Sequence, residues 1–403
     1  MSLQDRVGEL LPLLNAAFPA HIVDVVDRFL ADAVGAEEVE LLLADYDQRE
    51  LRPLSSHDGD PLVSGAVLPI DDSPAGRAFL VQAAITEPED AGIRLYQPIS
   101  LRNERIGVLG LRLPQPLSTD TLTGLAATAD ILGYIILAAS RFTDLFEQAR
   151  RVRPLTLEAE VQWGLQPVRA FGCPEFALAG QLVPAYDVGG DTYDWVVNRG
   201  VASLYALDAM GHGLNASMIG ALAVTAMRNA RRAGLGMVER FEAANEAIRR
   251  QFGSTSGTIV PFATAAALEV DIASGTAVAL SAGHPWPYRV RDGRIDQVGL
   301  APQFPLGIFA ETTYATEELS LMPGDRLVLL SDGVLEAVPK DGEPFGEVRL
   351  AAALLASRSK APHEAVRSLV RTLLDYQQGD LRDDATILVF DWHGTRDGGA
   401  PPV

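Results

Sequence analysis

Four short acidic clusters, each beside a glycine or at the end of an expected strand, are the residues of this chain best suited to chemistry. They contain Asp191, Asp208, Asp332 and the neighbouring pair Asp383 and Asp384. A glycine beside a carboxylate lets the backbone turn tightly and approach a ligand. Hard divalent cations such as Mg²⁺ and Mn²⁺ prefer carboxylate, carbonyl and water oxygens. If the fold brings these aspartates together, they form a site for such a cation.

The alternative interpretation is that each aspartate belongs to an ordinary turn. In a chain with 53 acidic residues, an aspartate next to a glycine is usually a turn residue. Asp208 and Asp332, however, each follow an almost wholly apolar run, 203–207 and 327–330. An unpaired charge at the end of a buried strand is costly without a cation. Four such clusters in one chain therefore favour a metal site.

Charge and composition limit the classes of protein to which this chain can belong. It has 33 basic and 53 acidic residues, and the formal net charge of −20 would repel nucleic acid and anionic lipid. A hydrophobic content of 48% predicts a folded protein, and 403 residues suffice for two or three domains. We therefore expect no nucleic-acid partner.

Cysteine usage and hydropathy indicate the compartment. Cys173 is the only cysteine, which excludes an intramolecular disulfide and a thiolate cluster for zinc or iron–sulfur. The first residues lack the basic-then-apolar order of a signal peptide, and the longest apolar run, 131–139, is about half of what a spanning helix requires. We expect a cytoplasmic protein with no membrane span.

The N-terminal part has the pattern of a small α+β domain. Strand-like runs at 39–44, 95–101 and 106–113 alternate with turns. Ser73 followed by Pro74 predicts the start of a helix, with the serine as its N-cap. These elements predict one domain ahead of the first long helical pattern.

Helical periodicity dominates from 119 to 152, where apolar residues recur at steps of three and four. We expect one long connecting helix there. Pro154 interrupts the pattern, and a second helical run, 157–165, ends before Pro167. The long helix either pairs with that of a second copy as a two-stranded coiled coil, giving a homodimer, or packs against its own domain.

Beyond residue 176, groups of strands alternate with pairs of helices. Strands are predicted at 176–184, 201–207, 263–271, 276–281, 288–291, 326–331 and 386–390, and helices at 213–232, 238–252, 347–356 and 363–376. Because helix pairs separate groups of strands, we predict two sheets with helices packed outside them. The segments 253–257 and 397–403 are expected to be flexible.

The motifs that contain the aspartates closely resemble, in order, those of the bacterial SpoIIE-type PP2C (PPM) serine/threonine phosphatases. The resemblance rests on the segments 188–194 (VGGDTYD), 208–213 (DAMGHG), 282–285 (AGHP), 305–307 (PLG), 323–325 (PGD), 331–337 (SDGVLEA) and 383–386 (DDAT). It spans roughly 157–390. The run 159–162 also looks like the helix that precedes the catalytic domain in that family, although Gln166 stands where the family usually has leucine.

This resemblance implies a β-sandwich flanked by helices that holds two Mn²⁺ or Mg²⁺ ions and a bridging water over a phosphoserine or phosphothreonine. By position, Asp208 would bridge both ions. The other implied ligands are Asp191 and the backbone carbonyl of Ala209 for one ion, and Asp332 and Asp383, with Asp384 as the fallback, for the other. Two ions lower the pKa of the shared water and clamp the phosphoryl oxygens, so no protein nucleophile is needed.

The residues around the implied ligands leave the general acid open. The implied supporting residues are Gly190, Gly211, Gly333, Asp384 and Thr386. In the eukaryotic branch of the family a histidine two residues after the bridging aspartate is thought to be the general acid, and here that position is Met210. We interpret His212 as a turn residue and His284 as a loop-packing residue, so protonation of the leaving group is unassigned.

Four motifs in the N-terminal part look like those of a GAF-type sensor domain, of the kind often joined to these phosphatases. They lie at 67–69, 73–79, 95–99 and 105–109. A related PAS-like fold is the alternative. Because this region has no cysteine and no histidine pair, we expect a small organic ligand or a purely dimerising role rather than haem or metal sensing.

The expected organisation is α+β, with a GAF-like sensor domain at 15–140, a helical linker at 141–167, a PP2C-like phosphatase domain at 168–392 and a flexible tail at 393–403. The resemblance implies dephosphorylation of a STAS-domain anti-sigma factor antagonist under control of the sensor. Two alternatives stay open. One is a non-catalytic partner-switching adaptor, and the other is a metallohydrolase of small phosphoesters.

Overall fold

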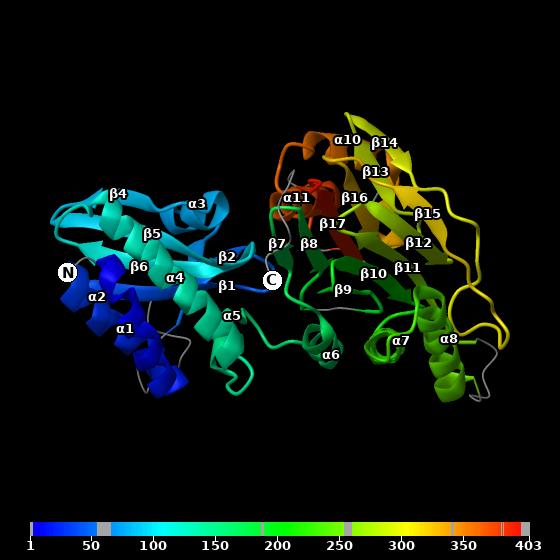
Figure 1. Ribbon diagram of the computed structural model, residues 1–403, viewed down its shortest axis with the longest axis horizontal. Coiled ribbons are helices and arrows are strands. Elements are labelled where there is room, and N and C mark those ends of the chain that lie inside the picture. Colours follow the sequence, from blue (N-terminus) through cyan, green and yellow to red (C-terminus); the bar gives the residue numbers. More distant parts are fainter. Residues whose placement is uncertain are drawn as a thin grey trace. The chain divides into compact units, whose positions relative to one another are not determined.

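The computed structural model describes residues 3–54, 66–186, 189–253, 260–339, 342–379, 381 and 383–395. The chain divides into two compact units, Met1–Pro154 and Leu155–Val403, which we call the N-terminal and C-terminal units (Figure 1). Apart from residue 253, the predicted flexible segments 253–257 and 397–403 lie outside the described residues, and the predicted tail 393–403 is described only to residue 395.

The N-terminal unit is built on one six-stranded antiparallel sheet with the order β3-β2-β1-β6-β5-β4. Its elements are α1 Leu3–Ala16, the 3₁₀ turn η1 Pro19–His21, α2 Ile22–Val34, β1 Glu38–Ala44, β2 Glu50–Pro53, β3 Leu68–Pro69, α3 Pro74–Val81, β4 Ile85–Glu89, β5 Gly92–Leu101, β6 Glu104–Leu113, α4 Thr119–Ala139 and α5 Leu145–Arg150. Alternate residues of β1 face opposite sides, as the two-residue period of a strand requires. Leu41 and Leu43 pack with α1, α2 and α4, whereas Leu42 and Ala44 pack with α3.

Two predictions for this unit have different outcomes. Ser73 is the N-cap of α3, because its Oγ accepts a hydrogen bond from the Gly76 backbone N–H at 3.0 Å. The single helix predicted over 119–152 is wrong, since α4 and α5 are separate. The Ser140 hydroxyl donates to the Ile136 carbonyl at 2.8 Å, and Thr143 Oγ1 accepts from the Leu145 N–H at 3.3 Å. These polar side chains bond the backbone locally and so end one helix and begin the next.

Helix α4 packs within its own unit. Within the described residues it is the one helix that is long and apolar enough to cross a membrane by length and composition, with a mean hydropathy of 1.7. Leu125, Ala129 and Leu132 of its apolar stripe are nevertheless fully buried in the core with α1 and α2. The apolar stripe of α4 therefore packs against its own domain, which is one of the two predicted alternatives. Pairing with a second copy would need another face of the helix.

The C-terminal unit contains two antiparallel sheets, ordered β15-β12-β11-β10-β9 and β14-β13-β16-β17-β8-β7. Its strands are β7 Ala170–Gly172, β8 Phe176–Val183, β9 Thr192–Asn198, β10 Val201–Ala209, β11 Ala263–Asp271, β12 Thr276–Ala282, β13 Tyr288–Arg291, β14 Arg294–Gln297, β15 Glu317–Ser320, β16 Arg326–Leu330 and β17 Ala385–Trp392. Its helices are α6 Leu157–Leu165, α7 Leu214–Arg232, α8 Met237–Phe252, α9 Asp332–Leu335, α10 Gly346–Ala356 and α11 Pro362–Gln377. The whole chain is therefore mixed α/β.

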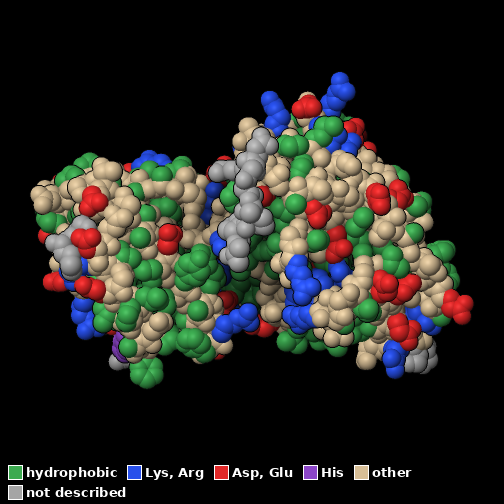
Figure 2. Space-filling model, in the orientation of Figure 1, with side chains coloured by type: hydrophobic (Ala, Val, Ile, Leu, Met, Phe, Trp, Pro, Cys, Tyr) green, Lys and Arg blue, Asp and Glu red, His purple; other side chains and the backbone are tan. Residues whose placement is uncertain are grey.

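One hydrophobic core joins the inner faces of these two sheets. It includes Leu204 and Leu268 from the first sheet and Leu329 and Phe390 from the second, all buried. Helices α7 and α8 cover the outer face of the first sheet, and α10 and α11 cover that of the second (Figure 1). Figure 2 shows acidic and basic side chains interspersed on the drawn face of each unit, so the net charge of −20 is not gathered into one patch there.

The sequence analysis predicted no strand between 184 and 201, and that omission is wrong. Strand β8 ends at Val183, and Asp191 comes directly before β9, which the pattern did not predict. Strand β9 contains the charged residue Asp194, which interrupts the apolar pattern that would have predicted a strand. Asp194 is buried because it forms ion pairs with Arg228 and Arg231 of α7 at 2.8 and 3.1 Å.

Candidate metal centre

Strand pairing brings the four acidic clusters to one end of the two sheets. In the first sheet Leu207 of β10 lies opposite Thr192 of β9, which sets Asp208 beside Asp191. In the second sheet β16 pairs with β17, and beyond the last pair the Ser331 N–H donates to the Thr386 carbonyl at 3.1 Å. Asp332 and Asp383 therefore follow and precede neighbouring strand ends.

The five aspartates form a site with a buried base and an open mouth. Asp191 and Asp384 are 2% and 6% exposed, and Asp208 is half-buried. Asp332 and Asp383 are exposed. A ligand from solvent would therefore meet Asp332 and Asp383 first and Asp191 last.

A hydroxyl group that the sequence analysis left without a role fixes the innermost carboxylate. The Ser331 hydroxyl donates to Asp191 Oδ2 at 2.5 Å and accepts from the Thr386 backbone N–H at 2.9 Å. Ser331 is completely buried. A signal for it was present, because a serine at the end of a wholly apolar strand must find a hydrogen-bond partner inside the protein.

Asp384 anchors the loop that carries Asp191. Its Oδ2 accepts hydrogen bonds from the Gly189 N–H at 2.5 Å and from the Asp191 N–H at 3.3 Å. The Ser217 hydroxyl of α7 donates to the Gly189 carbonyl at 2.6 Å, so the same loop is also tied to a helix. One carboxylate oxygen of Asp384 thus already accepts two backbone hydrogen bonds, whereas the side chain of its neighbour Asp383 is exposed. This difference favours Asp383 over Asp384 as the ligand of an ion in the open mouth.

Burial and mutual repulsion raise the pKa of four of the carboxyl groups. The pKa of Asp208 rises to about 7, first through burial and then through the charges of Asp332 and Asp383. Burial also raises the pKa of Asp384 to about 7, although two backbone N–H donors act in the opposite direction. The pKa of Asp191 rises well above its usual value through burial and the charges of Asp208 and Asp384. Burial and Asp383 raise that of Asp332.

The donor set fits a hard divalent cation by its chemistry. Within the described residues, no lysine or arginine forms an ion pair with any of the five aspartates. Also within that part of the chain, no group of three or more histidine, cysteine or acidic side chains is placed so that it could hold a metal ion as it stands. The fit therefore rests on the excess of carboxylate oxygens, whose repulsion a cation such as Mg²⁺ or Mn²⁺ would relieve.

Two of the predicted supporting glycines are required by close backbone contacts. A Cβ atom on Gly190 would lie 2.2 Å from the carbonyl oxygen of Ala209, the implied backbone ligand. A Cβ atom on Gly333 would lie 1.8 Å from the carbonyl oxygen of Asp384. Gly211 has a φ of +91°, a conformation that favours glycine, in the loop between β10 and α7. Val188 of the same motif lies outside the described residues.

The two histidines near the site differ in their surroundings. His212 is exposed in the loop that follows Asp208. His284 is buried, its Nδ1 lies 2.8 Å from Thr264 Oγ1, and burial lowers its pKa to about 3. Thr264 lies opposite Asp208 in the β10–β11 pair. His284 is therefore a neutral packing residue behind the carboxylates, and Met210 remains where other branches have histidine.

Comparison with known proteins links this geometry to a family. Residues 198–393, just under half of the chain, match the family model described as stage II sporulation protein E (SpoIIE). The curated phosphoserine phosphatase RsbP of Bacillus subtilis is 23% identical over 190 residues, which cover 47% of this chain and 45% of that protein. The chain thus spans less than half the length of this relative.

Two solved structures are similar to part of this chain. The RsbU and RsbW domains of a Mycobacterium tuberculosis protein are 26% identical, with 55% of this chain and 62% of that chain covered and a TM-score of 0.47. The PP2C phosphatase domain of SpoIIE from Bacillus subtilis, solved with a fragment of its regulatory domain, is 18% identical, with 55% and 65% covered and a TM-score of 0.47. The part of the C-terminal unit that matches the SpoIIE family model, 198–393, contains Asp208, Asp332, Asp383 and Asp384.

Proposed function

We propose that this chain is a metal-dependent phosphatase that hydrolyses phosphoserine or phosphothreonine in a protein. The observation that carries the proposal is the convergence of five aspartates from four separate segments. The pKa values of Asp191, Asp208, Asp332 and Asp384 are raised, and within the described residues none of the five has a basic partner. Structural carboxylates are normally paired, whereas carboxylates that repel one another in a cleft are typical of a functional site. The family match supports the same activity.

Each aspartate has a separate task in this proposal. Asp208 would contribute to the binding of both ions, Asp191 and the Ala209 carbonyl would hold one of them, and Asp332 and Asp383 would hold the other. When bound, two Mn²⁺ or Mg²⁺ ions supply an activated water and neutralise phosphoryl oxygens.

The chain's own residues do the positioning. Ser331 orients the Asp191 carboxylate, and Asp384 fixes the backbone on which Asp191 stands. The exposed pair Asp332 and Asp383 gives the phosphoryl group its entrance. These contacts hold the innermost ligand rigid and leave the mouth accessible.

We propose a STAS-domain anti-sigma factor antagonist, in its phosphorylated form, as the substrate class. The support is the similarity to RsbP and to a chain that joins RsbU and RsbW domains. Phosphate release from such a phosphoprotein and from p-nitrophenyl phosphate, each with added Mn²⁺ or with EDTA, tests the proposal. We expect turnover of both with Mn²⁺ and none with EDTA, and a kcat/KM at least tenfold higher for the phosphoprotein.

Other results of that assay select the alternatives. Hydrolysis of the aryl phosphate alone would indicate a metallohydrolase of small phosphoesters. Absence of turnover by a folded protein that still binds the phosphoprotein would indicate an adaptor. Turnover that survives EDTA would exclude the metal-dependent mechanism.

We also propose that the N-terminal unit, a GAF-like sensor for a small organic ligand, regulates the site through α6 and α7. Arg228 of α7 donates to the carbonyl of Leu165, the last residue of α6, and to both oxygens of Asp194. Asp194 lies in β9, three residues after Asp191. Because Ser217 of the same helix holds the loop before Asp191, a shift of α6 would reach the site through α7.

Removal of residues 1–154 tests this route. We expect the deletion to change kcat several-fold in the wild type and to have a much smaller effect in Arg228→Ala, because the variant already lacks the hydrogen bond between α7 and the Leu165 carbonyl of α6. Arg250→Ala is the control, since its side chain is 80% exposed on α8. Equal effects of the deletion in wild type and Arg228→Ala would exclude the route.

A further inference from the structure

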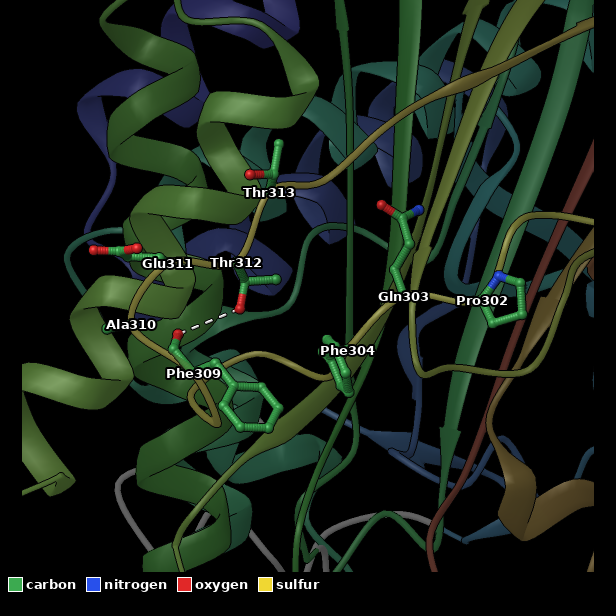
Figure 3. A pocket seen from close by; sticks show the side chains of 8 residues that line it. All are labelled: Pro302, Gln303, Phe304, Phe309, Ala310, Glu311, Thr312 and Thr313. Carbon is green, nitrogen blue, oxygen red and sulfur yellow. Dashed lines mark hydrogen bonds between the residues drawn. The ribbon is translucent and has the colours of Figure 1, made fainter.

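The loop between β14 and β15 forms a pocket with two exposed aromatic rings. The pocket has a volume of about 760 Å³ and is lined by residues 302–304 and 309–313 (Figure 3). Phe304 and Phe309 are 59% and 49% exposed, and their rings meet edge to face at 4.7 Å. Single exposed phenylalanines are common on proteins, but a contacting pair that lines a pocket is a candidate binding surface.

The backbone of this loop is held in place. The Asn245 side chain of α8 donates to the Phe309 carbonyl at 3.0 Å and accepts from the Gly307 N–H at 2.7 Å. The Gln303 side chain closes the base of the loop through two hydrogen bonds to the backbone of Ala315, at 3.0 and 2.6 Å. The Thr312 hydroxyl donates to the Phe309 carbonyl at 3.3 Å (Figure 3). A surface fixed in this way loses little entropy when it binds.

The same loop adjoins the carboxylate site. Ala263 of β11 lies opposite Ala209 of β10 and also forms a β-bridge with Leu306, with hydrogen bonds of 2.8 and 3.0 Å. Two strand spacings therefore separate Leu306 from the strand of Asp208, about 10 Å. Phe304 and Phe309 are two and three residues from Leu306. An extended peptide advances about 3.3 Å per residue, so side chains three to five positions from a phosphoserine would reach the rings.

Other exposed apolar side chains lie close in sequence to the ends of β10 and β11 near the carboxylates. Leu214 and Met218, in the first turns of α7, are 36% and 46% exposed. Val260, just before β11, is 49% exposed. The carboxylates are thus bordered by apolar residues along the edge formed by α7, β11 and the β14–β15 loop.

The negative charge around the pocket and the carboxylate site favours an apolar, non-acidic segment of a substrate. Glu311 is the one charged residue that lines the pocket, and Asp332 and Asp383 are exposed in the mouth of the site. An acidic segment would be repelled there, whereas aliphatic side chains would bury against Phe304 and Phe309.

We infer that Phe304 and Phe309 form a docking surface for aliphatic side chains that lie three to five residues from the phosphorylated residue of a protein substrate. This inference rests on the proposed function, because the carboxylate site defines where the phosphorylated residue lies. Recognition is by apolar contact, and the phosphoryl group is recognised separately at the aspartates.

Two fluorescent phosphoserine peptides test the surface. One has leucine at the positions three to five residues on either side of the phosphoserine, and the other has alanine there. We expect the wild type in EDTA, where the proposed function predicts no hydrolysis, to bind the leucine peptide about tenfold more tightly, as measured by fluorescence anisotropy. Phe304→Ala and Phe309→Ala are each expected to remove most of that preference. Phe142→Ala, which removes a ring that is 72% exposed in the N-terminal unit, should retain it.

Hydrolysis of p-nitrophenyl phosphate separates this inference from the proposed function. Both pocket variants should hydrolyse it within twofold of the wild-type rate, because it carries no flanking residues. Equal binding of the two peptides, or a preference that survives in both variants, overturns the docking surface even if the enzyme is active. A preference that depends on the two rings in a protein without phosphatase activity supports docking and rejects the proposed function. If the variants convert a dimer to a monomer in light scattering, the occupant is a second copy and the inference is wrong.

Discussion

Replacement of Asp208 by asparagine is expected to abolish phosphate release while making the metal-free protein more stable. Asp208 is the residue proposed to bridge both ions, and loss of a shared ligand should lower kcat by at least about 1,000-fold, or about 4 kcal/mol. The carboxylate is also the centre of the repulsion, since burial and the charges of Asp332 and Asp383 raise its pKa to about 7. Phosphate release with Mn²⁺ and thermal unfolding with EDTA measure the two effects.

The pH dependence of this stabilisation has a definite sign. Because folding raises the pKa of Asp208 to about 7, its protonated form favours the fold and its charged form opposes it. The contribution of the group is fully present below the usual aspartate pKa and is lost as the pH rises through 7. In EDTA at pH 8, Asp208→Asn should therefore unfold at a temperature several degrees above that of the wild type, and at pH 4 the two should coincide.

Asp292→Asn is the matched control for this experiment. Asp292 is exposed, lies in the turn between β13 and β14, and has a φ of +49°, which asparagine tolerates. It should alter neither turnover nor the pH dependence of unfolding. An Asp208→Asn variant that is destabilised at pH 8 without metal would mean that the carboxylates do not repel one another.

The two adjacent aspartates before β17 should respond differently to the same substitution. Asp384 accepts two backbone hydrogen bonds, and asparagine can accept both through its Oδ1, so Asp384→Asn should keep activity within about tenfold of the wild type. Asp384→Ala leaves the Gly189 and Asp191 N–H groups without their acceptor and should weaken Mn²⁺ binding by about 10–100-fold. Asp383→Asn removes a proposed ligand charge and should lower kcat by at least about 100-fold.

Calorimetric titration with Mn²⁺ and steady-state kinetics together distinguish the roles. If Asp384→Asn is as inactive as Asp383→Asn, both carboxylates bind metal and the anchoring role is insufficient. If Asp383→Asn keeps its activity while Asp384→Asn loses it, the metal ligand is Asp384, and the assignment of Asp383 is wrong.

The elements that the sequence predicted best are those with strong periodicity. Helix α6 at 157–165 and strand β11 at 263–271 have the predicted bounds, because polar and proline residues border clear apolar patterns. Strand β9 was missed because its buried Asp194 is neutralised by arginines from α7, a contact distant in sequence. The break between α4 and α5 was missed because Ser140 and Thr143 cap it through local hydrogen bonds within an otherwise helical pattern.

The residues of the candidate site could be proposed from the sequence, but the contacts between their side chains could not. Acidic clusters near glycines or strand ends, together with the family resemblance, singled out Asp191, Asp208, Asp332 and Asp383 without any knowledge of their contacts. The division of labour between Asp383 and Asp384 depends on which carboxylate points at the Gly189 loop, and adjacent residues of the same type carry no signal for that. The hydroxyl bridge of Ser331 likewise depends on long-range packing.

The position of β17 makes formation of the site depend on the synthesis of this strand. This strand lies between β16 and β8 in the middle of its sheet, and Asp384 just before it holds the loop of Asp191, almost two hundred residues earlier. A nascent chain on the ribosome acquires all its other proposed ligands before this strand emerges, but the sheet then lacks an interior member. A chain that stops ahead of β17 would therefore lack both this interior strand and the anchor of the Asp191 loop, and we expect it not to assemble the carboxylate site.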